Sequence, residues 1–154
     1  MIVADAGPLI ALARVGQLGL LRQVAVEVAI PDAVYRELMT EVPGRPGSAE
    51  LAQAAWLLRR QSTQPLPAPE LHEGEREAIA LARHLRLPLL IDEKRGRRLA
   101  RRLHLQVFGT LGLLAEAKRQ GVVQEVRPVV EGLIASGYWI APKTVSEFLT
   151  LSGE

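Results

Sequence analysis

The sequence predicts an α/β fold built on a short parallel sheet of about four strands, with helices on both faces. Two observations predict this class. Short apolar runs alternate with longer stretches of helical periodicity, and turn-forming residues separate them. Strands connected by helices pair in parallel, and their right-handed crossovers place helices on both faces of the sheet. The length of 154 residues is typical of one globular domain, which we expect to span residues 1–154.

Short apolar runs that end at a turn or a capping residue predict the strands. They lie at residues 1–4, 24–30, 88–91 and 106–108. Asp5 directly follows the first run, and Asp92 directly follows the third. Because ligands bind at the carboxyl ends of parallel strands, we expect both aspartates at the binding edge of the sheet.

Helical periodicity and N-capping residues predict the helices between these strands. They cover residues 8–13, 18–23, 32–39, 48–58, 73–85, 93–103, 110–120, 124–136 and 142–151. Residues 59–71 are polar and contain Pro65, Pro67 and Pro69, so we predict a surface loop there.

The composition excludes several classes of protein. The chain has no cysteine, which excludes a disulfide framework, a thiolate nucleophile and a cysteine-based zinc site. Its N-terminus lacks a signal-peptide pattern, and no apolar stretch is long enough to cross a bilayer. We therefore expect a cytoplasmic protein without membrane contact. The net charge of +2 permits a polyanionic partner without requiring one.

The common catalytic motifs are also absent. The sequence has no phosphate-binding loop of the G-x-x-x-x-G-K-[ST] type, no G-x-G-x-x-G after a strand and no G-x-S-x-G. The histidines, His72, His84 and His104, lack metal-ligand spacing, and we expect them to be solvated. Carboxylates are the remaining candidates for chemistry.

Glutamates on two predicted helices add to the strand-end aspartates. Glu37 lies at the edge of the apolar stripe of the helix over residues 32–39. Glu75 shares a helix face with the apolar residues three, four and seven positions later, whereas Glu77 lies further round and is the second choice. All of these acids also have structural interpretations. The aspartates suit turn or helix caps, and the glutamates suit solvated or first-turn helix positions.

Carboxylates gathered in one cleft predict a divalent metal site. Mg²⁺ and Mn²⁺ prefer oxygen ligands. Without an ion, converging carboxylates repel and raise one another's pKa. With ions bound, the same site can activate water and stabilise an in-line phosphodiester displacement. The preferred ligands are Asp5, Glu37, Glu75 and Asp92.

A basic helix is the second candidate feature. Six of the nine residues from Lys94 to Arg102 are Lys or Arg, and this helix begins directly after Asp92. We expect Lys94, Arg95 and Arg98 to hold the phosphates of a nucleic acid. The alternative is a solvated helix exterior.

An ordered set of segments resembles the PIN-domain family, in a branch close to the VapC-type toxins of toxin–antitoxin pairs. The segments are Asp5-Ala6-Gly7-Pro8-Leu9-Ile10-Ala11-Leu12, Pro31 through Glu37-Leu38, Gly74-Glu75-x-Glu77-Ala78-Ile79-x-Leu81-Ala82, Leu90-Ile91-Asp92-Glu93-Lys94-Arg95-Gly96-Arg97 and Gly109-Thr110-Leu111-Gly112. The resemblance covers essentially the whole chain. It implies a three-layer α/β/α fold and a metal-dependent endoribonuclease that binds Mg²⁺ or Mn²⁺ through acids at the carboxyl edge of the sheet.

The resemblance also assigns the acids one by one. Asp5 matches the acid after the first strand, and Glu37 matches the acid on the helix after the second strand. Glu75 matches the third acid best, with Glu77 as the alternative.

The remaining matches lie in the second half of the chain. Asp92 matches the last acidic region, where Glu93 is a neighbouring option, and Thr110 resembles the small hydroxyl residue that supports the site. Ala6 departs from the Thr or Ser that usually follows the first acid, so one supporting hydrogen bond is missing. The resemblance further implies RNA as the substrate, a homodimer, and a small antitoxin whose tail covers the acids.

Two other functions stay open on the sequence. One is a nucleic-acid-binding or partner-regulated module with a degenerate, inactive metal site, which Ala6 and the use of Glu in place of Asp favour. The other is a flavodoxin-like signalling domain with Asp5 and Asp92 in a phosphoacceptor pocket. The absence of the usual strand-end lysine makes that function the least favoured.

Overall fold

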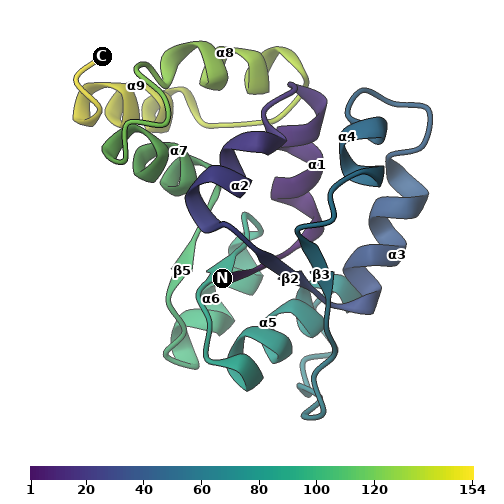
Figure 1. Cartoon of the computed structure of the whole chain (residues 1–154). Coiled ribbons are helices and arrows are strands. Elements are labelled where there is room, and N and C mark those ends of the chain that lie inside the picture. Colours follow the sequence, from purple (N-terminus) through teal and green to yellow (C-terminus); the bar gives the residue numbers. More distant parts are fainter.

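The computed structural model describes residues 1–154 and contains a five-stranded sheet (Figure 1). The strands are β1 (Ile2–Ala4), β2 (Val28–Ile30), β3 (Leu57–Arg59), β4 (Leu89–Leu90) and β5 (Val107–Phe108). Their order across the sheet is β3-β2-β1-β4-β5, and every pairing is parallel. The predicted α/β class with a parallel sheet is confirmed.

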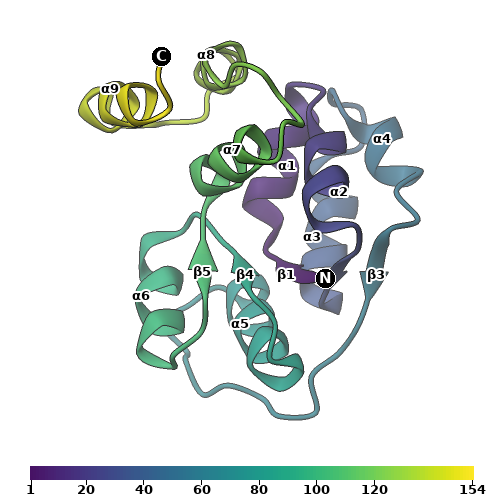
Figure 2. The same cartoon turned by 60° about the vertical axis from the view of Figure 1, so that its left-hand side comes forward.

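Helices cover both faces of this sheet. The helices of the chain are α1 (Ala6–Arg14), α2 (Leu18–Ala25), α3 (Asp32–Glu41), α4 (Ser48–Ala52), α5 (Glu73–Leu85), α6 (Lys94–Arg102), α7 (Thr110–Arg119), α8 (Arg127–Ala135) and α9 (Pro142–Leu151). Helices α1, α2 and α7 lie over one face, whereas α5 and α6 lie over the other (Figures 1 and 2). Strands β1, β2 and β4 are buried along their whole length, as expected for parallel strands between two helical layers.

The direction of the chain across the sheet reverses between β1 and β4. After β1 the chain passes through α1 and α2 to β2, whereas after β4 it passes through α6 to β5 on the other side. Such a reversal opens a crevice at the carboxyl ends of the two strands, where α/β proteins bind ligands. Asp5 directly follows β1, and Asp92 comes shortly after β4, so both lie at this edge.

The three C-terminal helices pack against the first two helices through a second apolar cluster. Its buried members are Ala11, Leu20, Leu114, Val126, Val129, Val130, Leu133 and Leu149. The Glu154 carboxylate accepts hydrogen bonds from Lys118 Nζ at 2.7 Å and from the Val126 backbone N–H at 2.9 Å. These contacts hold the end of α9 against α7 and α8. They therefore position the connection between α8 and α9, residues 136–141.

The largest departure from the predicted elements lies in residues 48–59. The helix predicted over residues 48–58 ends at Ala52 as α4, and Leu57–Arg59 form β3 instead. This strand is at the edge of the sheet, is only partly buried, and pairs with β2, which is distant in sequence. The local sequence pattern therefore gives little indication of β3. It is the fifth strand, whereas the sequence predicts about four.

The boundary between α2 and β2 also differs from the prediction. Helix α2 continues to Ala25, and β2 begins only at Val28. Val26 has a φ of 64°, a conformation that β-branched residues rarely adopt, and it ends the helix and turns the chain toward the strand. None of the helices combines the length and hydropathy that spanning a membrane demands.

Candidate functional site

Asp5 is the most deeply placed of the predicted acids. Its backbone N–H donates to the Leu90 carbonyl of β4 at 2.9 Å, which fixes the residue at the junction of β1 and β4. The side chain is only 7% exposed and makes no capping hydrogen bond to α1. Helix capping therefore does not account for the Asp5 carboxylate, although the Ala6 backbone N–H lies close enough to lower its pKa.

Glu37 reaches the same space from α3. The residue lies on an exposed part of the helix, but its carboxylate turns toward the first turn of α5. A Cβ atom added to Gly74 would lie 3.0 Å from Glu37 Oε2 and 3.7 Å from Asp5 Oδ1. The two carboxylates thus border one small volume, which the missing side chain of Gly74 leaves open.

Glu75 and Glu77 have different surroundings although both lie near the start of α5. Glu75 is 9% exposed and faces the other acids. Glu77 accepts hydrogen bonds from the Ala33 backbone N–H at 3.0 Å and from Gln61 Nε2 at 2.9 Å. Glu77 therefore fastens the start of α3 and the loop after β3, whereas Glu75 is the acid of this pair that lies beside Asp5.

Asp92 is held by the start of α7. Its Oδ1 accepts a hydrogen bond from the Thr110 backbone N–H at 2.8 Å, and its Oδ2 accepts one from Thr110 Oγ1 at 2.6 Å. The cap of α6 is the neighbouring Glu93, whose carboxylate accepts from the Arg95 backbone N–H at 3.1 Å. The structure thus gives Glu93 the capping role considered for Asp92, and Thr110 orients Asp92.

Three of the gathered acids, Asp5, Glu37 and Glu75, have raised pKa values. The pKa of Asp5 is raised to about 7, mainly by burial and also by the charges of Glu75, Glu37 and Asp92, and the Ala6 backbone N–H offsets part of this rise. Burial also raises the pKa of Glu37 and of Glu75. None of the four acids forms an ion pair with a lysine, arginine or histidine. Their mutual repulsion is therefore not neutralised by a direct ion pair, although the charge of His72, beyond ion-pair distance, lowers the pKa of Glu37 and of Glu75 in part.

This donor set fits a hard divalent cation. As placed, no three acidic or histidine side chains converge closely enough to hold one ion together. Mg²⁺ commonly uses only one or two carboxylates and keeps several waters, and the Asp5 and Glu37 carboxylates beside Gly74 meet that requirement. All the available donors are oxygen atoms, which is the preference of Mg²⁺ and Mn²⁺.

The predicted cations lie on the outside of α6. Lys94, Arg95 and Arg98 are exposed and form no ion pair. Arg97, which the sequence analysis did not single out, lies closer to the acids. A Cβ atom added to Gly109 would be 2.6 Å from Arg97 Nη1 and 2.7 Å from Asp92 Oδ1, so the two groups approach one another beside Gly109.

The connection between α8 and α9 brings two aromatic residues to the same region. Tyr138 and Trp139 line a cavity of about 550 Å³ together with Asp92 and Arg97. Burial raises the pKa of the Tyr138 hydroxyl, and the Asp92 charge raises it further. Sequence reasoning missed both aromatic residues. The available signal was an adjacent Tyr-Trp pair after Gly137 in a chain with only 4% aromatic residues.

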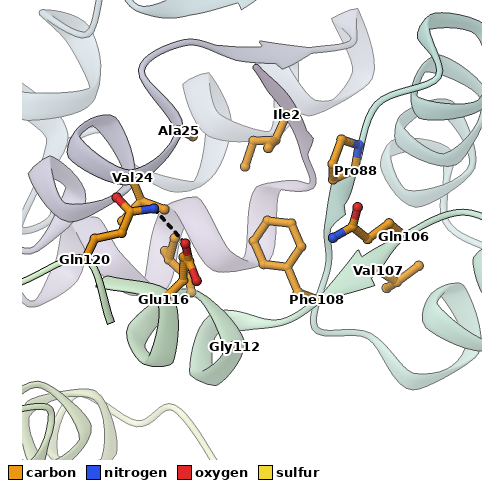
Figure 3. Close-up of a pocket in the computed structure, with 11 residues that line it drawn as sticks. Ile2, Val24, Ala25, Pro88, Gln106, Val107, Phe108, Gly112, Glu116 and Gln120 are labelled. Atoms are coloured by element: carbon orange, nitrogen blue, oxygen red, sulfur yellow. Dashed lines mark hydrogen bonds between the residues drawn. The ribbon is translucent and has the colours of Figure 1, made fainter. Parts of the chain in front are cut away.

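A further cavity, of about 390 Å³, lies toward the amino ends of the strands and shares Val107, Phe108 and Gly112 with the cavity of about 550 Å³ (Figure 3). Ile2, Pro88 and Gln106 come from the amino ends of three strands, and Phe108 points into the cavity. Its carboxylate, Glu116, is already hydrogen-bonded to Gln120 at 2.7 Å and paired with an arginine. This cavity does not contain any of the predicted site residues.

A comparison with known protein families agrees with the observed fold. The family model DUF3368, described as a PIN domain, matches residues 1–154. No curated protein and no solved structure matches the chain. Because the family match spans the whole sequence, the chain belongs to the PIN domain family, which is a family of nuclease type.

Proposed function

We propose that this protein is a metal-dependent endoribonuclease that hydrolyses RNA phosphodiester bonds, with Asp5, Glu37, Glu75 and Asp92 as the ligands of Mg²⁺ or Mn²⁺. One observation carries the proposal: the buried Asp5 carboxylate has no cationic partner and borders the same open volume as Glu37. Burying charged groups without compensation is costly, so such an arrangement favours a cation from solution. When bound, the ion supplies Lewis acidity toward water and the phosphate oxygens.

The residues of the chain have distinct parts in this proposal. Asp5 and Glu37 border the same open volume and would bind the ion first, and Glu75 and Asp92 would complete the set of ligands. Thr110 fixes the orientation of Asp92 by donating two hydrogen bonds to its carboxylate. Both oxygens of Asp92 thereby keep their position when substrate or solvent exchanges. Mutation of a residue that orients a metal ligand typically lowers metal affinity or activity by roughly 10- to 100-fold.

The cations of α6 position the substrate. Lys94, Arg95 and Arg98 form no ion pairs. They lie on α6, which begins two residues after Asp92. Arg97 lies nearest to the Asp92 carboxylate. A phosphate at the acids would lie nearest Arg97, whose charge offsets the repulsion between the phosphate and the carboxylates. The exposed cations of α6 would attract the neighbouring RNA backbone.

The resemblance to VapC-type toxins supports a finer proposal. The protein acts in the cytoplasm as the toxin of a toxin–antitoxin pair, forms a homodimer, and is inhibited by a small antitoxin that covers the acids. Expression of the chain alone should arrest growth of the host, and the Asp5→Asn variant should not. Unimpaired growth with the wild-type chain at matched expression would contradict the toxin role.

The nuclease proposal is tested by cleavage of a mixed RNA pool. We expect cutting by the wild-type chain with Mn²⁺, none with chelator, and a loss in Asp5→Asn larger than the roughly 10- to 100-fold cost of an outer-shell partner. Asp32→Asn is the matched control, because Asp32 is a surface aspartate paired with Arg59 at 3.2 Å. The control should cut like the wild type. Equal cutting under all conditions would exclude the metal role.

The competing function is a nucleic-acid-binding or partner-regulated module without catalysis. It is favoured by Ala6, which offers no hydroxyl beside Asp5, and by the absence of a group of three converging ligands. Calorimetry separates the two functions. Mn²⁺ binding that disappears in Asp5→Asn supports the nuclease, whereas RNA binding without any Mn²⁺ binding supports the module.

A further inference from the structure

Trp139 is the most unusual surface residue near the acids. The residue is 81% exposed, although tryptophan is a largely buried residue type in folded proteins. The chain has one other tryptophan, Trp56, which is partly buried against the main core cluster. An exposed indole presents a large flat aromatic face to solvent and suits a role in binding.

The backbone directly before Trp139 is held in place. Gly137 has a φ of 99°, which turns the chain away from the end of α8. The Tyr138 N–H donates to the Leu133 carbonyl at 3.0 Å, and the Tyr138 ring lies half-buried with its hydroxyl near Asp92 and Thr110. Trp139 therefore has a defined position relative to the Asp92 carboxylate and is not part of a loose loop.

Two cavities meet at Trp139. The cavity of about 550 Å³ contains Asp92, Arg97 and Trp139. A neighbouring cavity of about 380 Å³ contains Arg14 and Glu37, and it shares Asp92 and Trp139 with the first. The indole thus stands between two grooves that both reach the carboxylates, and each groove carries one arginine.

This geometry suits one class of ligand. A nucleic-acid strand that runs from one groove to the other would place its phosphates near Arg97 and Arg14. One of its bases would then lie over Trp139. Only an unpaired base offers its face to a side chain, because both faces of a base within a duplex are already stacked. Stacking on an aromatic side chain tolerates any base, so this contact selects single strands and not a sequence.

We infer that Trp139 is a stacking platform that positions an unpaired RNA base next to a phosphate held by Arg97, beside the Asp92 carboxylate. The inference rests on the proposed ribonuclease function and adds to it a positioning residue that acts on an unpaired base. The competing role of an exposed tryptophan is a contact with another protein chain, and the experiment below distinguishes the two roles.

Fluorescence titration with chelator present tests the inference without cleavage. In Trp56→Phe, Trp139 is the only tryptophan, and we expect its emission to be quenched saturably by a short oligouridylate. In Trp139→Phe, the signal comes from Trp56 and should not respond. Trp139→Leu should weaken oligouridylate binding by about 5- to 150-fold, the range for loss of one base–aromatic stack. Trp139→Phe keeps an aromatic face and should lose less.

Two comparisons identify stacking as the cause. Trp139→Leu should leave the affinity for duplex RNA unchanged, and it should leave the salt dependence of oligouridylate binding unchanged. Arg97→Gln, which removes a charge from the same cavity, should reduce the salt slope by about 0.7. Circular dichroism of each variant establishes that it folds.

The outcomes separate this inference from the proposed function. Wild-type cleavage with an unresponsive Trp139, or equal losses for single strands and duplex, overturns the inference and leaves the nuclease intact. Quenching without cleavage under any metal condition overturns the nuclease and keeps the stacking platform. A Trp139→Leu variant that binds RNA normally but changes its oligomeric state assigns Trp139 to a protein interface and overturns the inference. Absence of any RNA binding by the wild type overturns both.

Discussion

Glu75 and Glu77 lie two positions apart in α5, yet Glu75 is a candidate metal ligand and Glu77 has a structural role. Glu75 is buried beside Asp5, and the Glu93 charge contributes to the rise of its pKa. Glu77 accepts the Ala33 N–H at 3.0 Å. An amide oxygen can accept the same hydrogen bond, so Glu77→Gln preserves that contact.

We predict opposite results for the two substitutions. Glu75→Gln should reduce Mn²⁺-dependent cleavage by more than roughly 10-fold, because it removes a charge from the site. Glu77→Gln should leave cleavage within about threefold of the wild type and lower stability by no more than about 1 kcal/mol. Cleavage rates and urea unfolding of both variants check this. A larger catalytic loss in Glu77→Gln would reverse the assignment of the third acid.

At the residue scale, position in sequence predicts some site residues and not others. Asp5 and Asp92 are predictable because each comes at the end of a short apolar strand, and parallel strands share one carboxyl edge. Arg97 and Trp139 are not predictable in this way. Arg97 approaches Asp92 only because Gly109 leaves room. Trp139 reaches the acids only because the C-terminal helices pack on α1 and α2.

At the scale of elements, the site depends on how closely the start of α5 approaches α3. Gly74 lies in the first turn of α5 and faces Glu37 and Asp5. Its φ is not positive, so an alanine fits the backbone. The added Cβ would lie 3.0 Å from the flexible end of Glu37, which must then move by a few tenths of an ångström.

Gly74→Ala should therefore lower the affinity for the metal ion without lowering the stability of the fold. Alanine in a helix is favoured over glycine by up to about 1 kcal/mol, so the free energy of unfolding should stay equal or rise. Mn²⁺ affinity should fall, because the methyl group occupies the volume between the two carboxylates. Urea unfolding and calorimetry measure the two effects.

The control for this substitution is Gly19→Ala in α2, where an added Cβ meets no atom within 4 Å. It should give a similar gain in stability with unchanged Mn²⁺ affinity. Unchanged Mn²⁺ affinity in both variants would show that the ion does not bind between Asp5 and Glu37.

The elements themselves were predictable to the extent that their signal is local. The 13-residue helix α5 combines strong periodicity with an acidic first turn, and its predicted range of residues 73–85 is confirmed. Strand β3 has three residues, lies at the sheet edge and exists through its pairing with β2. Its formation depends on contacts between distant segments, which local periodicity does not report.

At the scale of the whole molecule, the buried acids should make stability depend on pH. In the metal-free chain, the pKa of Asp5 is raised from 3.8 to about 7. Between these two pH values the folded state retains a proton that the unfolded state has released. The free energy of unfolding should therefore fall as pH rises from about 4 to about 7, by at most about 4 kcal/mol for Asp5, and then level off.

Two other acids, Glu116 and Glu154, change the stability of the fold in a lower pH range. Hydrogen bonds lower the pKa of Glu116 to about 2, mainly through Arg119, and that of Glu154 to about 2, mainly through Lys118. Their contributions are present above the ordinary pKa near 4.5 and are lost as pH falls toward 2, so they are constant from about pH 5 to 7. Changes in that window therefore report the raised acids.

Urea unfolding between about pH 5 and pH 7, with chelator, should show a steeper decline in stability for the wild type than for Asp5→Asn. Mn²⁺ should cancel the decline in the wild type, since an ion that binds the ionised carboxylates stabilises the folded state by mass action, and increasingly so as pH rises. The same ion should have little effect on Asp5→Asn. Parallel pH profiles for the two proteins would mean that Asp5 is not the acid that holds its proton to high pH. A decline that Mn²⁺ does not reverse would mean that the gathered carboxylates repel one another without forming a metal site.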